Sequence, residues 1–232
     1  MDIASLIRSA DRKATALAAI SFAMLLVKAV ALNRIEAPYA AMFDLGVLAD
    51  AVLTSVVASY VFYLIVVHLK ESQDKSVLAP YVNRHTLRVV TLCQSQLNDI
   101  ARTSGVNLDF DTLEVTQLAD AFGRIHPYSD APLVLAPDNR NANWYQYFDF
   151  HRGRSKESIQ RVLAQLPFLD ATHVGLLAEV DDCSHFNFIP LFLHVPTRNT
   201  DMASFASMFF SYCKSCQDLS KYMSKSGMRS AA

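Results

Sequence analysis

The chain has 232 residues with 21 lysines and arginines, 22 aspartates and glutamates, and a formal net charge of −1. This near-neutral balance excludes a protein built for bulk nucleic-acid binding, and the 52% hydrophobic content excludes global disorder. Six glycines and four cysteines exclude collagen-like and disulfide-scaffold classes, whereas the positive mean hydropathy of +0.18 indicates membrane-embedded sequence.

Two long apolar stretches lie near the N-terminus. Sixteen of the nineteen residues in 14–32 and fifteen of the nineteen in 51–69 are apolar. About 20 such residues in a helix cross the hydrocarbon core of a bilayer. We therefore predict a two-helix transmembrane hairpin in residues 1–70, with spans at about 14–32 and 47–69. A soluble helical hairpin buried in a core is the alternative.

The basic residues around these spans predict their orientation. Three basic residues lie within 8–13, and Lys70 and Lys75 follow the second span, whereas the loop 33–44 carries one basic residue, Arg34. The positive-inside rule therefore predicts that both termini are cytoplasmic. A second interpretation of the N-terminus is a signal peptide, because Ala29-Val30-Ala31 is similar to a cleavage site; cleavage would leave one span.

Two charged residues lie inside the predicted spans. Lys28 is about one turn from the outer end of the first span, and Asp50 is about one turn into the second. In an antiparallel hairpin these depths coincide, so we expect a polar pair at the membrane interface. The alternative is a role in conduction or sensing, because ionisable groups in a membrane are costly and often functional.

Small residues form a stripe on the second span. Ala51, Ser55 and Ser59 are four residues apart, and Ala19 and Ala23 have the same spacing on the first span. Such faces let helix backbones approach closely, and hydroxyls can bond across them. The stripe is a predicted helix-packing surface, either within one chain or between copies of the chain.

Residues 71–232 carry a helical pattern, and we predict an all-α cytoplasmic domain of about six helices. The first follows Pro80 in its first turn and ends near Ser104-Gly105. Its apolar face has a period near 3.6 and comprises Val82, Val89, Val90, Cys93, Leu97 and Ile100. The second helix begins at a capping-box pattern, Asp111 with Glu114, and runs to about Arg124.

The rest of the domain begins with a long loop, 126–143, which contains one extended piece at 133–135. Four further helices are predicted after it: 144–166 with a break at Gly153, then three helices capped by Asp170, Ser184 and Thr200 that reach about 179, 193 and 225.

Cysteine and histidine supply the metal candidates. Cys213 and Cys216 form a C-x-x-C pair that Cys183 and His185 would complete to a tetrahedral zinc set. The same thiols are on one helix face and would pack equally well in a core, as reduced cysteines usually do. We predict core packing, no metal and no cofactor.

A basic cluster follows an aromatic run at 144–150. Arg152, Arg154 and Lys156 face solvent in the simplest interpretation. They are also candidates for contact with acidic lipid or a protein partner, and contact with a nucleotide or nucleic acid is the least favoured alternative.

Two segments are similar to small bacterial inner-membrane proteins that have two spans followed by a helical cytosolic domain. They are residues 58–71 (ASYVFYLIVVHLKE) and residues 168–184, which contain FLDATHVGLL followed by Glu179 and Asp181-Asp182-Cys183-Ser184. The resemblance is one of layout and implies the bacterial inner membrane. By analogy of layout, we include a stress or anti-phage defence component among the expected roles.

The expected function is therefore that of a membrane-anchored interaction or sensing protein, which acts as a homo-oligomer or with a protein partner. No phosphate-binding or catalytic motif occurs in the chain, so an enzyme is less favoured. The alternatives are a membrane-bound enzyme with its site near His151, Asp181 and His185, and a small channel that uses Lys28, Asp50, Ser55 and Ser59.

Overall fold

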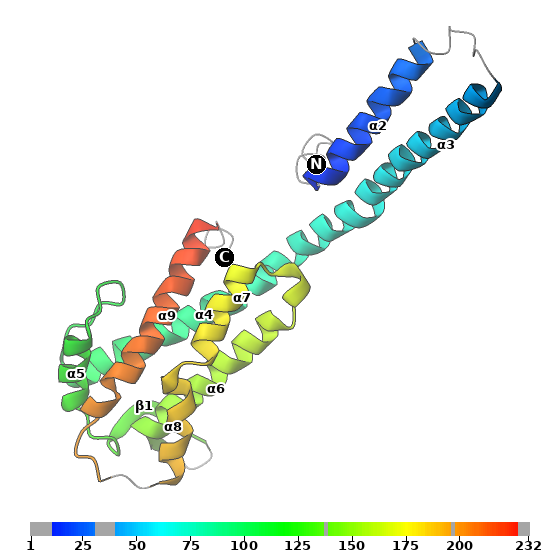
Figure 1. Cartoon of the computed structure of the whole chain (residues 1–232). Helices are drawn as coiled ribbons and strands as arrows, with labels where there is room; N and C mark the ends of the chain where they lie inside the picture. Colours follow the sequence, from blue (N-terminus) through cyan, green and yellow to red (C-terminus); the bar gives the residue numbers. More distant parts are fainter. Residues whose placement is uncertain (1–10, 31–39, 137–138, 196–197, 227–232) are drawn as a thin grey trace. The chain divides into compact units, whose positions relative to one another are not determined.

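The computed structural model of the chain describes residues 11–30, 40–136, 139–195 and 198–226. Arg8, Ala31 and Arg34, which carry part of the orientation and cleavage interpretations, lie outside the described residues. The chain divides into two compact units, Met1–Val77 and Leu78–Ala232. The described residues are mostly helical, as predicted (Figure 1).

The first unit contains two long apolar helices, α2 (Arg12–Val30) and α3 (Ala40–Phe62), which pack against each other. Asp11 begins α2, because its carboxylate accepts a hydrogen bond from the Lys13 backbone N–H at 2.9 Å. Residues Arg12–Val30 and Asp44–Val67 are long and apolar enough to cross a membrane, and they overlap the predicted spans 14–32 and 47–69 with an offset of two or three residues.

The second helix of this pair continues without a loop. A π-helical segment, Tyr63–His68, follows α3, and α4 (Leu69–Ser104) begins directly after it. The prediction that a separate helix starts at Pro80 is wrong, because Pro80 lies inside α4. Proline there removes one hydrogen bond to the preceding turn, at a cost of about 3 kcal/mol, and the burial of the following apolar face from Val82 onward offsets this cost.

The second unit has its own core, to which α4 contributes the face that the sequence predicts. All six apolar residues of the predicted face are buried: Val82, Val89, Val90, Cys93, Leu97 and Ile100. The helix ends at Gly105, which has a φ of +71° and therefore supplies the left-handed backbone of a helix end at low cost.

Helix α5 (Val115–Gly123) begins three residues later than predicted. Its N-cap is Glu114, whose backbone N–H donates to the Gln117 side chain at 3.4 Å. The predicted capping box of Asp111 with Glu114 is wrong, because Asp111 belongs to a turn in which Asp109 accepts from the Asp111 backbone N–H.

The region predicted as a long loop forms an antiparallel hairpin instead. Strand β1 (Asp130–Leu135) contains the predicted extended piece and pairs with β2 (Arg140–Asn143), so the domain is not purely helical. Asn139 closes the turn with a φ of +49°, a conformation that asparagine tolerates better than most residues.

Helix α6 (Trp144–Leu163) runs through Gly153, where a break was predicted. It begins at Asn143, whose side chain accepts from the Gln146 backbone N–H at 2.9 Å. A Cβ at Gly153 would meet no atom within 4 Å, so this glycine does not mark a close approach or a bend.

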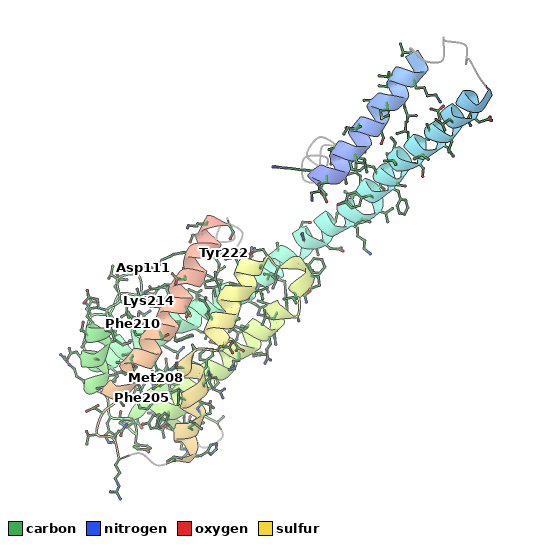
Figure 2. The ribbon with its side chains drawn as sticks, viewed as in Figure 1. Asp111, Phe205, Met208, Phe210, Lys214 and Tyr222 are labelled. Carbon is green, nitrogen blue, oxygen red and sulfur yellow. The ribbon has the colours of Figure 1, made fainter. Side chains whose placement is uncertain are left out.

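The last three helices are α7 (Ala171–Asp181), α8 (Ser184–His194) and α9 (Ala206–Lys225). Asp170 caps α7 as predicted, and the N-cap of α8 is Cys183 rather than Ser184. Helix α9 begins after a short 3-10 turn, Ala203–Phe205, and not at Thr200. It packs against α5, α7 and α8, and Figure 2 labels Met208, Phe210, Lys214 and Tyr222 along it.

Candidate functional site

The predicted charged pair of the apolar hairpin comes together in the structure. Lys28 Nζ lies 2.5 Å from Asp50 Oδ2, and the Lys28 ammonium also donates to the Gly46 carbonyl oxygen. Gly46 permits this approach, because a Cβ at this position would lie 3.3 Å from Lys28 Nζ. The Lys28 side chain is 20% exposed and that of Asp50 is 45% exposed, so the ammonium is partly shielded while the carboxylate lies at the edge of the contact.

Polar contacts also join the other end of the two helices. The hydroxyls of Thr15 and Tyr60 lie 2.8 Å apart. Between the two polar contacts, the less exposed residues of α2 and α3 repeat every three or four positions, which is the spacing of an antiparallel helix seam. We call this set the seam; it comprises Ala18, Ser21, Leu25 and Lys28 on α2 and Gly46, Asp50, Leu53, Val57 and Tyr60 on α3, and Val56 is a further less exposed residue at its flank.

The predicted small-residue stripe is not part of the seam. Ala51, Ser55 and Ser59 are all exposed, as are Ala19 and Ala23 on α2. At 100° per residue, the centre of the stripe lies about 180° around α3 from the centre of the seam. Packing between α2 and α3 therefore does not use the stripe, although the sequence left this possibility open.

The four residues of the channel alternative do not share a face either. Lys28 and Asp50 lie in the seam and satisfy each other, whereas Ser55 and Ser59 lie on the opposite side of α3. The structure therefore provides no continuous polar lining from these residues within one hairpin.

The basic cluster of the second unit is largely neutralised by neighbouring acids. Arg152 pairs with Asp149 at 2.7 Å, and Lys156 pairs with Asp181 at 2.8 Å. Arg154 lies over the Phe150 ring at 5.6 Å. Two of the three predicted contact residues are thus engaged inside the unit, and this leaves little free positive charge for lipid or a partner.

The zinc set considered as the alternative to core packing is not assembled among the described residues. No group of three or more histidine, cysteine, aspartate or glutamate side chains within the described ranges is placed to hold a metal ion. Instead, Cys213 Sγ lies 3.6 Å from the thiol of Cys93, a residue that the sequence analysis placed only in the core. Burial raises the pKa of Cys93 well above its usual range and that of Cys183 to about 11, so both thiols are protonated near neutral pH.

His185 is enclosed by aromatic rings. It stacks on Tyr212 at 5.5 Å and meets Phe148 and Phe209 edge-on at 5.3 and 5.1 Å. Neither ring nitrogen has a hydrogen-bond partner, and burial lowers the pKa of His185 to about 3. The imidazole is therefore neutral and inaccessible, which suits packing better than proton transfer.

The other members of the enzyme alternative lie in different surroundings. His151 packs on the Tyr147 ring at 4.4 Å, and Asp181 is held by Lys156. No hydrogen bond or ion pair in the part of the chain that the structure describes joins His151, Asp181 and His185. The three residues therefore do not form a catalytic group.

Two polar networks were not predicted from the sequence. The Tyr147 hydroxyl donates to Asp99 Oδ2 at 2.6 Å, which joins α6 to α4. The Tyr222 hydroxyl donates to Asp170, which also caps α7, so one carboxylate ties α7 to α9. The hydrogen bonds from Tyr222 and from the His173 backbone lower the pKa of Asp170. Burial, together with the hydrogen bond to Asp170, raises the pKa of Tyr222.

A cavity of about 230 Å³ opens beside the first turn of α6. Among the residues that the structure describes, seven line it, from the segment before β1, from the start of α6 and from the end of α8: Tyr128, Asn143, Tyr145, Gln146, Phe192, Leu193 and His194. None of them was predicted as a site from the sequence, because they come from three segments that only the fold brings together.

Comparison with known proteins found no matching family model, no similar curated protein and no similar solved structure.

Proposed function

We propose that the protein is anchored in a membrane by α2 and α3 and self-associates there, so that residues 78–226 act as a cytoplasmic interaction and sensing unit. One observation carries the proposal: the apolar surface of both helices faces outward. Only 11% of the apolar window of Arg12–Val30 and 0% of that of Asp44–Val67 are buried. A core helix of a soluble protein would be mostly buried, whereas lipid covers such a surface at no cost.

The distribution of polar groups supports the same proposal. The charged pair Lys28–Asp50 and the hydroxyl pair Thr15–Tyr60 are both turned into the seam. In hydrocarbon, polar side chains are stable when they face a neighbouring helix and satisfy each other. In a water-soluble hairpin the leucines would be expected in the helix contact and the charges in water, whereas here Lys28 and Asp50 pair at the contact and several leucines face outward.

The small-residue stripe supports self-association. Ala51, Ser55 and Ser59 face away from α2, so their close-packing surface has no partner among the described residues of the hairpin. A helix of a second copy would supply that partner, and the serine hydroxyls would bond across the contact. The bacterial source and the defence role expected above stay predictions.

Membrane anchoring is tested by extracting cell membranes with alkaline carbonate and floating the vesicles in a density gradient. We expect the full chain to remain with the floated vesicles and to leave them only in detergent. Recovery of the chain in the soluble fraction would overturn the proposal.

Self-association is tested by cysteine cross-linking in native membranes. We expect Ser55→Cys to form disulfide-linked dimers under mild oxidation. The matched control is Thr54→Cys, at the same depth on α3 but about 100° away around the helix. Equal cross-linking of both variants, or of neither, would contradict packing through the stripe.

A further inference from the structure

The cavity at the start of α6 has a preformed aromatic wall. The Tyr145 ring is buried and stacks on Phe192 at 5.4 Å with an angle of 14° between the planes. Phe205 contacts both rings, at 5.5 and 4.7 Å, and holds them from behind. Tyr128 meets Tyr145 edge-on at 5.7 Å and is 42% exposed, so it forms the rim. A flat ligand would find this wall already in place.

Two amide groups in the lining are oriented by the cap of α6. The Asn143 side-chain oxygen accepts from the Gln146 backbone N–H at 2.9 Å, and the Gln146 side-chain oxygen accepts from the Asn143 backbone N–H at 3.0 Å. Both oxygens are therefore occupied, and each amide is left with its NH₂ group. Neither NH₂ group has an acceptor within the described residues. The cavity thus offers hydrogen-bond donors to a ligand that carries acceptors.

The charge and the size of the cavity limit the class of ligand that it can bind. Within the described ranges its lining includes no lysine, arginine, aspartate or glutamate, so a phosphate or a carboxylate would meet no permanently charged partner there, only the imidazole of His194 and the amide donors. Its volume of about 230 Å³ lies below the roughly 300–1,000 Å³ of sites for drug-sized molecules, which leaves room for one or two rings.

We propose that this cavity binds a purine or pyrimidine base without its phosphate, either free or as a nucleoside. A base can stack on the exposed Tyr128 ring, whose plane lies at 79° to that of Tyr145, while the Phe192 ring that Tyr145 backs gives it an apolar wall. The ring nitrogens and carbonyl oxygens of the base accept from the amides of Asn143 and Gln146. The inference uses residues of the second unit only. It goes beyond the proposed membrane anchoring and self-association, and it holds or fails independently of both.

The test uses the full chain in detergent micelles and saturation-transfer NMR. The probes are adenine, adenosine, guanosine, cytidine and uridine, with ribose and adenosine monophosphate as comparisons. We expect saturation of the base protons of at least one base or nucleoside, none for ribose, and weaker binding of the monophosphate. A stronger signal for adenine than for adenosine would assign the free base, and the reverse would assign the nucleoside.

The decisive variant is Gln146→Glu. Glutamate keeps an oxygen for the Asn143 N–H and is a favoured third residue of a helix, so the fold is retained, but the NH₂ donor is replaced by an anion. Binding should fall at least tenfold in Gln146→Glu and about tenfold in Tyr128→Ala, which removes a stacking ring. Phe150→Ala, an exposed aromatic residue outside the cavity, should bind as the wild type does.

Two results would overturn the proposal. One is the absence of saturation for every base and nucleoside at millimolar concentration. The other is binding that Gln146→Glu and Tyr128→Ala leave unchanged. Failure of the membrane or cross-linking experiments would not affect either result, because those experiments address the first unit.

Discussion

The enclosed imidazole of His185 predicts a specific loss of stability in acid. Its pKa is about 3 in the folded chain because of burial, against an ordinary value of 6.5. As the pH falls below about 6.5, the unfolded chain binds a proton that the folded chain refuses until about pH 3. The stability that neutral His185 contributes is therefore full above pH 6.5 and is lost progressively down to about pH 3.

The magnitude follows from the size of the pKa shift. One pKa unit corresponds to about 1.4 kcal/mol, so the complete loss is about 5 kcal/mol, of which about 2 kcal/mol is lost between pH 7.5 and pH 5. Burial also lowers the pKa values of His85, His151 and His173, which act in the same direction. The contribution of His185 is therefore measured as a difference between the wild type and His185→Leu.

The assay is urea unfolding of the full chain in detergent, followed by tryptophan fluorescence. Trp144 is the chain's one tryptophan and is fully buried in the second unit, so its emission reports that unit. The wild type should lose about 2 kcal/mol more than His185→Leu between pH 7.5 and pH 5. At pH 7.5 the variant should be nearly as stable as the wild type, because both ring nitrogens lack partners and no hydrogen bond is removed.

His194→Leu is the control for the change of residue type, because His194 is exposed at the end of α8. Its free energy of unfolding at pH 7.5 and pH 5 gives the effect of replacing an exposed histidine, against which the effect of His185→Leu is compared. A difference below about 0.5 kcal/mol between the wild type and His185→Leu at pH 5 would show that the ring is hydrated or partnered, and would refute the reasoning.

Three further predictions use the same fluorescence assay or simple thiol chemistry. Gly105→Ala should destabilise the second unit by about 1 kcal/mol, because the residue at this position has a positive φ. Gly153→Ala should stabilise it by about 0.5–1 kcal/mol, because a Cβ in this part of α6 meets no other atom. Equal effects of the two substitutions would contradict the backbone conformation assigned to Gly105. Asp170→Ala should lower the free energy of unfolding by about 1–3 kcal/mol, because it removes both the cap of α7 and the acceptor of Tyr222. Tyr222→Phe should lower it less, because it removes only the hydrogen bond to Asp170. A polyethylene-glycol maleimide should modify none of the four buried cysteines in the folded chain and all four in denaturant, and rapid modification of the native chain would be inconsistent with the core.

The sequence predicted those parts of the fold that depend on local periodicity. The buried face of α4 follows from a 3.6-residue repeat, and the cap of α7 follows from Asp170. Strand β2 was missed because Arg140–Asn143 has no β-branched or aromatic residue. Its pairing with β1 is held by backbone hydrogen bonds and by the turn at Asn139, and neither leaves a pattern in the side chains.

The cavity could not be predicted from the sequence for a different reason. Its lining combines Tyr128, the first turn of α6 and the end of α8, and the rings of Tyr145 and Phe192 meet only because α6 packs against α8. In the sequence, each segment alone looks like part of the hydrophobic core or like a helix cap. The contact between the thiols of Cys93 and Cys213 could not be predicted either, because 120 residues separate them in the sequence.

The sequence pattern does not show which face of α3 packs against α2, but the energies of the two possible contacts do. Two faces of α3 suit helix packing: the face with Gly46 and Asp50 and the face with Ala51, Ser55 and Ser59. In the membrane that we propose, a lone aspartate inside the helix costs about 2.5–3.5 kcal/mol at the bilayer centre and somewhat less near the interface, whereas hydrogen bonds between membrane helices average about 0.6 kcal/mol each. Pairing Asp50 with Lys28 therefore outweighs packing against the serines. The face of α3 with Gly46 and Asp50 therefore packs against α2 of the same chain. The face with Ala51, Ser55 and Ser59 remains exposed and can contact a helix of a second copy.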